Sequence, residues 1–384
     1  MLELITGVLW CMVKAAGIDS GTKSVDIYAF DDSTGEILID EAIPRDLVTK
    51  DPSIVIEKIR EAEERFGSFD SIAVASGYGI PLKRAQEASD EEIALATFVS
   101  DEDVARGHRI LGLRKILLMF RDSRFNAYFV PGVIQLPTVP RYRKVNKIDM
   151  GTSDKVFSVV LAIKDQAERL GIGFEETSFI LVEIGYAYTS AIAVENGKIV
   201  DAMAGTAGFT SFLGLGFMDS ELAYAISNIS KMPRELLFRG GVADYAGTRD
   251  IEEFIKAKGE AYHLFIESIV KDIAALLPSI IPREIILSGR FTRIPEFFDD
   301  VKKSIKEFFS KLNLEIDVVK LQTRARVAKE AAEGAAVLAN SLAGGKYKDI
   351  AEVLGIRNSS GTIFDYVCLP LKDELINTYK KLKL

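Results

Sequence analysis

The chain has 384 residues, of which 48% are hydrophobic and 27% are charged, so it can form large cores and lacks the composition of a disordered or collagen-like protein. Its 56 Asp and Glu residues outnumber 48 Lys and Arg residues, and the resulting net charge of −8 argues against a nucleic-acid-binding protein. Two cysteines and two histidines are too few for a disulfide framework or a Cys- or His-based zinc site.

Residues 1–11 contain a short apolar run that carries Glu3 and lacks a basic start. We interpret it as a non-secretory extension outside the fold and expect the first domain to begin at Met12. No run of about 20 apolar residues is available to span a membrane. These features predict a cytoplasmic protein with no membrane partner.

The first half predicts three strands joined by tight turns, at 13–19, 24–30 and 35–43. A helix follows over 51–67, with Asp51 as its N-cap and Gly67 as its stop. A fourth strand, 71–77, ends in glycine.

The same order returns in the second half. Strands are predicted at 178–185, 188–200 and 201–208, then a helix at 251–277 and a strand ending in glycine at 283–289. Further helices are predicted at 148–171, at 326–345 and near the C-terminus from 371. The repeated order predicts two copies of one α/β unit.

The duplicated unit, with a glycine turn after the first strand of each half, resembles the superfamily of acetate and sugar kinases, actin and heat-shock ATPases. The resemblance implies an α/β fold of two tandem ribonuclease-H-like (actin-like ATPase) domains around an interdomain nucleotide cleft. The implied division is a first domain at 12–150, a connecting helix and second domain at 151–345, and a C-terminal helical extension at 346–384.

Within that superfamily, the chain is most similar to the acetate and butyrate kinase branch and to a family of archaeal predicted butyrate kinases. Residues 141–160 (RYRKVNKIDMGTSDKVFSVV) share Gly151-Thr152-Ser153 and Lys155 with a segment of that branch. The stretch 73–87 (AVASGYGIPLKRAQE) is similar to the glycine turn that precedes a substrate-binding basic residue there.

The resemblance implies that the cleft binds ATP and Mg²⁺. Asp19 would hold the metal through water, because Mg²⁺ keeps several waters and takes one or two carboxylates, and Glu183 is the second candidate ligand. Gly21 would let the turn approach the phosphates, to which its neighbours would donate hydrogen bonds. The expected nucleotide-binding residues are Asp19, Ser20, Gly21, Thr22, Lys23, Ser24, Glu183, Gly185, Thr189, Gly205, Ser288, Gly289 and Arg290.

Four residues are candidates for the transfer step. Lys83 and Arg84 would clamp a substrate carboxylate, or they form a solvated basic pair. The acetate-kinase histidine falls at Met150, and Asp149 or Asp154 could supply a replacement acid. Alternatively, Asp149 or Ser153 caps the connecting helix.

The sequence therefore predicts an ATP-dependent phosphotransferase that acts on a small acid, such as a short-chain carboxylate, and that forms a homodimer. Two alternatives remain. The first is a non-catalytic or regulatory ATP-binding protein, which Met150, Tyr186 and Arg290 favour. The second is an ATPase that energises a partner enzyme.

Overall fold

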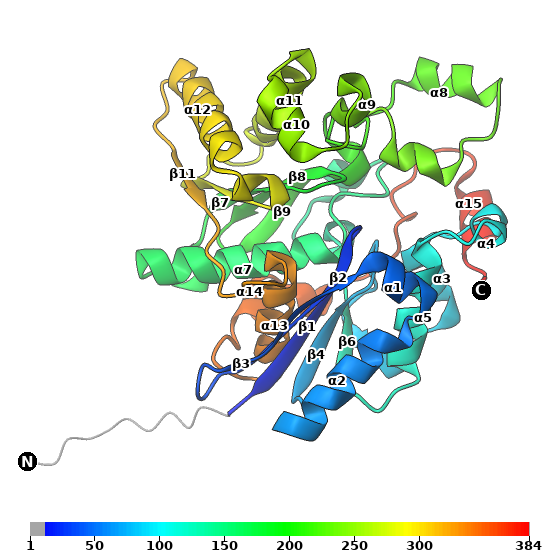
Figure 1. Cartoon of the computed structure of the whole chain (residues 1–384), viewed down its shortest axis with the longest axis vertical. Helices are drawn as coiled ribbons and strands as arrows, with labels where there is room; N and C mark the ends of the chain where they lie inside the picture. The colour runs from blue at the N-terminus through cyan, green and yellow to red at the C-terminus, as the bar shows by residue number, and fades with distance from the viewer. Residues whose placement is uncertain (1–11, 384) are drawn as a thin grey trace, which may run out of the picture.

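The computed structural model describes residues 12–383, in which the chain forms two mixed sheets, one of six strands and one of five (Figure 1). The expected extension at 1–11 lies outside the described residues. Among residues 12–383, no helix is both long enough and apolar enough to cross a membrane.

The first sheet has the order β3-β2-β1-β4-β6-β5. Strands β1 to β3 form antiparallel hairpins, whereas β4 and β6 run parallel to β1. Its strands are β1 (Lys14–Ser20), β2 (Ser24–Asp31), β3 (Ile37–Pro44), β4 (Ser71–Ala75), β5 (Lys83–Arg84) and β6 (Ala127–Val130). The helices of this half are α1 (Arg45–Lys50), α2 (Ser53–Phe66), α3 (Asp90–Thr97), α4 (Asp101–Ala105), α5 (Ile110–Arg121) and α6 (Arg141–Lys144).

The second sheet repeats this topology with the order β9-β8-β7-β10-β11. Its strands are β7 (Phe179–Ile184), β8 (Thr189–Glu195), β9 (Lys198–Ala204), β10 (Glu284–Ser288) and β11 (Asp317–Lys320). The helices after β9 are α8 (Ser220–Ser227), α9 (Val242–Ala246), α10 (Ile251–Ala257), α11 (Glu260–Leu276) and α12 (Pro295–Lys311). The predicted duplication is confirmed, because a three-stranded meander followed by parallel strands occurs in both halves.

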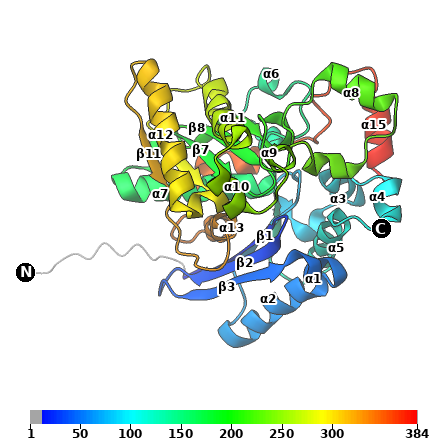
Figure 2. The ribbon, with the colours of Figure 1, turned by 45° about the horizontal axis from the view of Figure 1, so that its top comes forward.

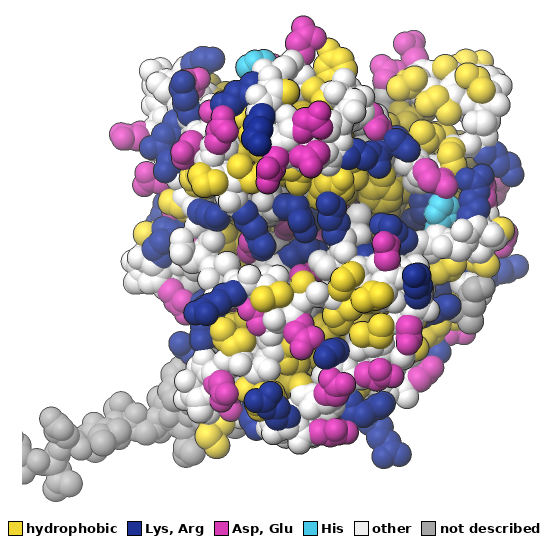
Figure 3. Space-filling model, in the orientation of Figure 1, with side chains coloured by type: hydrophobic (Ala, Val, Ile, Leu, Met, Phe, Trp, Pro, Cys, Tyr) yellow, Lys and Arg dark blue, Asp and Glu magenta, His cyan; other side chains and the backbone are white. Residues whose placement is uncertain are grey.

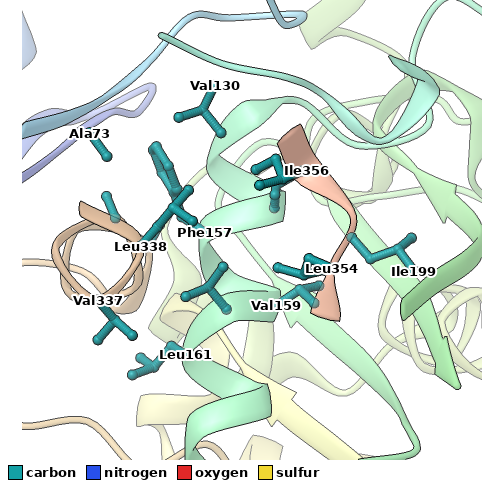
Figure 4. Close-up of a cluster of buried hydrophobic side chains, with 14 of the residues drawn as sticks. Ala73, Val130, Phe157, Val159, Leu161, Ile199, Val337, Leu338, Leu354 and Ile356 are labelled. Carbon is teal, nitrogen blue, oxygen red and sulfur yellow. The ribbon is translucent and has the colours of Figure 1, made fainter. Parts of the chain in front are cut away.

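Two helices, α7 (Ser153–Leu170) and α13 (Glu330–Leu342), pack against each other between the sheets (Figures 1 and 2). Their apolar side chains form one buried cluster with β1, β4 and the segment that contains α14 (Ile350–Val353) (Figure 4). The expected C-terminal extension therefore contributes Leu354, Ile356 and Phe364 to this core before the chain ends in α15 (Lys372–Tyr379).

Two glycines allow α13 to lie this close to its neighbours. A Cβ atom on Gly17 of β1 would lie 2.2 Å from the Ala336 nitrogen, and one on Gly334 would lie 2.0 Å from the Phe157 oxygen of α7. Both contacts are with backbone atoms, which a side-chain rotation cannot relieve.

Several predicted boundaries are wrong for local reasons. The predicted strand 188–200 contains a hairpin turn at Asn196-Gly197, so β9 already begins at Lys198. The predicted helix 251–277 is divided at Lys258-Gly259, where Lys258 has a positive φ of 44°. Pro52, and not Asp51, occupies the N-cap of α2, whereas Gly67 ends that helix as predicted.

We predict that Gly334→Ala destabilises the protein, although alanine normally stabilises a helix interior by about 1 kcal/mol relative to glycine. The clash with the Phe157 oxygen should outweigh that gain and lower the free energy of unfolding by a net ~1–3 kcal/mol, measured by urea denaturation. Gly112→Ala in α5 is the matched control, since its nearest atom would be 3.4 Å away. An equal response of both variants would contradict the packing argument.

Candidate functional site

The end of β1 carries a buried carboxylate cluster. Asp19 lies opposite Asp26 of β2 in the antiparallel register, so both side chains project from the same face of the sheet. Lys329, at the N-cap of α13, places its Nζ 3.3 Å from Asp19 Oδ2 and 3.1 Å from Asp26 Oδ2. The first strand and a helix more than 300 residues later therefore build one site.

Burial of Asp19 raises the pKa of its carboxyl to about 7, while Lys329 acts in the opposite direction. Burial alone would lower the pKa of Lys329, but the two carboxylates overcome it and raise that pKa. Oδ1 of Asp19 and Oδ1 of Asp26 are buried and accept no hydrogen bond within residues 12–383. Each carboxylate thus retains one oxygen for a cation or a water molecule.

The turn between β1 and β2 is arranged around this cluster. A Cβ atom on Gly21 would lie 1.9 Å from Lys329 Nζ, so this glycine makes room for a lysine of the protein itself. Arg45 of α1 donates to Ser20 Oγ at 2.6 Å, and Ser24 Oγ donates to Asp26 Oδ2 at 2.7 Å. Thr22 and Lys23 at the tip are exposed. The rest of the turn is thereby fixed while its tip is open to a ligand.

A second lysine–carboxylate cluster occupies the corresponding place in the other half. Lys155 Nζ of α7 lies 2.5 Å from Glu183 Oε1 and 2.8 Å from Asp154 Oδ2. Ser158 Oγ donates to Glu183 Oε2 at 2.7 Å, so both oxygens of Glu183 have partners in the protein. Lys155 lowers the pKa of Asp154 against the effect of burial, and its own pKa is raised by the two carboxylates, again against burial.

The hydroxyl groups of two serines flank Glu183. Ser190 of β8 and Ser288 of β10 both pair in register with Glu183, so the three side chains form a row on one face of the second sheet. Both serine oxygens are buried and have no hydrogen-bond partner in the described part of the chain. Buried hydroxyl groups in proteins normally have a hydrogen-bond partner. These two hydroxyls are therefore suited to bind a water molecule or a phosphate oxygen.

The two clusters form one electrostatic centre between the sheets. The charge of Asp154 contributes to raising the pKa of Asp19, and Lys329 contributes to lowering the pKa of Asp154. Four carboxylates (Asp19, Asp26, Asp154 and Glu183) face two lysines, so the centre has an excess of negative charge when all are ionised.

This centre fits a magnesium ion on the side of the first sheet only. Asp19 and Asp26 offer their unpartnered oxygens, and Mg²⁺ is commonly held by one or two carboxylates together with water and phosphate. Glu183 is already bonded to Lys155 and Ser158. No group of three or more His, Cys, Asp or Glu side chains within residues 12–383 is arranged as a complete metal site.

Lys23 brings the first domain into contact with the second. Its Nζ lies 3.6 Å from the centre of the Tyr186 ring, in the loop between β7 and β8. Burial and, to a smaller degree, Arg290 lower the pKa of Lys23. Arg290 itself is exposed. Figure 3 shows that Lys and Arg side chains gather in a band across the middle of this face, between the two halves.

The glycine loops of the second domain serve close backbone packing. Gly289 has a φ of 94°, and a Cβ atom there would lie 2.6 Å from the Ile184 oxygen at the end of β7. Gly185 donates its N–H to the Tyr188 oxygen at 3.0 Å, and Thr189 is buried at the start of β8. The predicted second phosphate loop and adenosine loop therefore meet at the ends of adjacent strands.

Asp149 connects the domains. Its Oδ1 accepts from the Gly151 N–H at 2.8 Å, and a Cβ atom on Gly205 would lie 1.9 Å from its Oδ2. Burial raises the pKa of Asp149 to about 6.

Neither Asp149 nor Ser153 caps α7, because the N-cap is Thr152 and no side chain makes the capping bond. That alternative is wrong. Ser153 Oγ instead accepts the Ser76 N–H, which ties α7 to the loop after β4.

The two basic residues expected to clamp an acid lie apart from this centre. Lys83 forms an ion pair with Glu92 of α3, and Arg84 is exposed on β5 at the edge of the first sheet. Their role in substrate binding stays a prediction.

A cavity of about 490 Å³ lies beside the centre, between the loops of the two halves and the C-terminal helix. Its walls include Asp103 and His108 from the first half, Thr206 and Arg234 from the second, and Tyr379 of α15. Neither Lys83 nor Arg84 is among the residues that line it.

Sequence reasoning missed Lys329 and Arg234. The sequence shows that Lys329 directly precedes the Ala-rich helix. No neighbouring residue indicates that its side chain contacts Asp19. No pattern around Arg234 distinguishes it from an exposed loop arginine.

The sequence of the chain matches the model of one protein family. The model of the family described as "Protein of unknown function (DUF1464)" matches residues 17–369. No curated protein matches the chain in sequence.

Two solved structures illustrate the fold. A propionate kinase from Francisella tularensis has 16% identity and a TM-score of 0.57, and the match covers 84% of this chain and 99% of that one. An acetate kinase from Entamoeba histolytica has 14% identity and a TM-score of 0.53, and the match covers 78% of this chain and 87% of that one. The expected fold of two actin-like ATPase domains is thereby confirmed.

We predict that Asp19 makes stability decline, relative to a variant that lacks this carboxyl, as pH rises from about 4 to about 7. The folded protein binds a proton at Asp19 more tightly than the unfolded chain does, since burial raises that pKa from 3.8 to about 7, so deprotonation disfavours the folded state. The raised pKa values of Asp149 and Asp272 act in the same direction. Asp19→Asn should make the decline shallower in urea unfolding followed across this range.

Asp299→Asn, on the exposed surface of α12, is the control and should keep the wild-type profile. Parallel profiles for wild type and Asp19→Asn would show that Asp19 does not titrate in this range.

Proposed function

The chain belongs to the DUF1464 family, and we propose that it is an ATP-dependent phosphotransferase whose acceptor is a small acid. The observation that carries the proposal is the carboxylate–lysine centre between the two sheets, which retains unpartnered acidic and hydroxyl oxygens beside an exposed turn. The fold, which it shares with the acetate and propionate kinases named above, supports the same reaction class.

The proposed reaction needs positioning and charge neutralisation more than covalent participation by the protein. An oxygen of the acid forms a bond to the γ-phosphorus of ATP, and the bond from that phosphorus to the β–γ bridging oxygen breaks. ADP leaves with the bonding electron pair, and an acyl phosphate is the second product.

Specific side chains support this reaction. Lys23 and Thr22 at the open tip of the first turn would donate to phosphate oxygens, as would the free hydroxyls of Ser190 and Ser288. Asp19 and Asp26 would hold Mg²⁺, which when bound neutralises charge on the phosphates. Lys155 and Lys329, each paired with two carboxylates of the centre, would supply fixed positive charge beside them.

Two observations favour a regulatory ATP-binding protein instead. Tyr186 lies in the second phosphate loop with Lys23 over its ring, and Met150 is fully buried at the position of the acetate-kinase histidine. If Lys23 stays on Tyr186 when nucleotide binds, the chain would bind ATP without transferring its phosphoryl group.

We predict that MgATP raises the melting temperature. A ligand that binds only the folded state stabilises it by about 2.7 kcal/mol at a hundredfold excess over its Kd. Asp19→Asn should remove the part of this shift that depends on Mg²⁺, and Asp299→Asn should keep it. No shift at millimolar MgATP would overturn the nucleotide site.

Turnover separates the two candidate functions. We predict that ADP forms from ATP in the presence of a panel of carboxylates, measured by a coupled assay, and that Lys23→Met lowers the rate. Lys83→Ala/Arg84→Ala tests the acid site predicted from the sequence, which a rate unchanged by this double exchange would refute. Nucleotide binding without turnover on any acid would support the regulatory protein.

A further inference from the structure

The cavity beside the centre has mainly apolar walls and one arginine, Arg234, that can bind a further hydrogen-bond acceptor. Arg234 Nε donates to Asp103 Oδ1 at 3.0 Å, and its Nη2 donates to the Phe98 carbonyl. Within residues 12–383, its Nη1 group makes no hydrogen bond of ordinary geometry, although the Tyr78 phenol lies close enough to interact with the guanidinium, and its side chain is only 13% exposed. A guanidinium held by two of its nitrogens is oriented for a third partner.

The acidic side chains of the cavity already have partners. Asp103 bonds Arg234 and accepts the Ser100 N–H, and Glu102 pairs with Arg106 at 2.6 Å. Besides the Thr206 hydroxyl and the His108 imidazole, the donor that remains is the Arg234 guanidinium. As a cation it favours an anionic head group, and a carboxylate forms charge-assisted hydrogen bonds with arginine.

The loop that presents Phe98 to Arg234 is built with backbone strain. Phe98 has a positive φ of 49°, which is unusual for a bulky side chain and is tolerated where surrounding contacts enforce it. Its carbonyl accepts from Arg234, and its ring packs on Tyr379 with 4.2 Å between ring centres. The strained residue therefore forms both the polar and the apolar part of the cavity.

The C-terminal segment closes this wall. Tyr379 stacks on Phe364, and the fully buried Arg114 donates to the Lys383 carbonyl. Lys383 also pairs with Asp101 of α4 at 3.0 Å. Figures 1 and 2 show α15 beside α4, with α8 on the same side of the molecule.

The volume of the cavity sets the size of the ligand. At about 30 Å³ for each water-sized group, a volume of 490 Å³ corresponds to roughly 16 such groups, so the four non-hydrogen atoms of acetate would fill about a quarter of it. The remaining walls are mainly apolar, with Phe98, Leu215, Met218, Met232, Leu236 and Leu237 among them. Apolar walls favour an apolar body over a second polar group.

The cavity also comes close to the Asp149 carboxylate. Thr206 lines it and follows Gly205, whose backbone lies against the Asp149 carboxylate. Tyr188 lines it too, and the charge of Asp149 contributes to raising the pKa of this phenol.

We propose that the cavity binds an apolar-chain carboxylic acid of about six to ten carbon atoms in all, its carboxylate on Arg234. This inference rests on the proposed function for its role as acceptor, but binding of the acid can be measured without ATP.

The test is calorimetric titration of the full chain with acetate, hexanoate and octanoate, and with hexanol and hexylamine as uncharged and cationic analogues. We expect hexanoate and octanoate to bind and acetate, hexanol and hexylamine to bind at least about tenfold more weakly. Arg234→Met should weaken hexanoate binding by about tenfold to a hundredfold. Arg239→Met, an exposed arginine of the same segment that does not line the cavity, should leave it unchanged.

A second variant guards against misfolding of Arg234→Met. Met232→Trp keeps the ion pair of Arg234 and fills the cavity, so it should weaken octanoate more than hexanoate. Equal binding of acetate and octanoate, or preferred binding of the amine or alcohol, would overturn this inference. Binding of hexanoate without phosphoryl transfer from MgATP would contradict the proposed function and leave the ligand assignment intact. Phosphoryl transfer to acetate alone would support the proposed function and contradict the ligand assignment.

Discussion

The close approach of α13 to both β1 and α7 is the constraint on which the rest of the structure depends. Gly17 and Gly334 permit it, because any side chain at either position would meet backbone atoms. The helix pair shares one apolar cluster with elements of both halves. Since α7 and α13 begin next to the strand ends of the two sheets, this packing also sets where Lys155 and Lys329 lie.

The lysines occupy unusual positions, because the N-terminus of a helix carries positive partial charge and disfavours a cation. Each is stabilised by two carboxylates at the ends of neighbouring strands or in the first turn of its helix. The duplicated fold thus produces a duplicated cluster, yet the two clusters differ in their hydrogen bonding. Within residues 12–383, both oxygens of Glu183 have partners, whereas Asp19 and Asp26 each retain an unpartnered oxygen. This asymmetry is the reason for proposing a metal in the first half only.

The sheets and the central helices could be predicted from the sequence because their signals are local: alternating apolar residues, glycine turns and a repeated order. The turn 20–24 was identified on the same basis, although Gly21 proved to accommodate Lys329. The contacts that define the site are distant in sequence. Lys329 is 310 residues from Asp19, and Arg234 is 131 residues from Asp103. Residue type and spacing do not predict pairings between residues this far apart. The break at Lys258-Gly259 shows further that apolar periodicity alone does not reveal where a helix is interrupted.

Contacts between the halves differ in character along the cleft. Near the helices they are buried and apolar, as around Phe157 and Val337. At the mouth they are polar: Lys23 on Tyr186 and Arg106 with Glu235 at 3.2 Å are partly exposed, whereas the ion pair of Arg234 with Asp103 is largely buried. Partly exposed ion pairs contribute little free energy, so separating the halves at the mouth costs far less than at the helices. The two halves are therefore held together mainly by the apolar contacts around the α7–α13 pair. Nucleotide at Lys23 and a ligand at Arg234 would each contact a side chain that bridges the two halves.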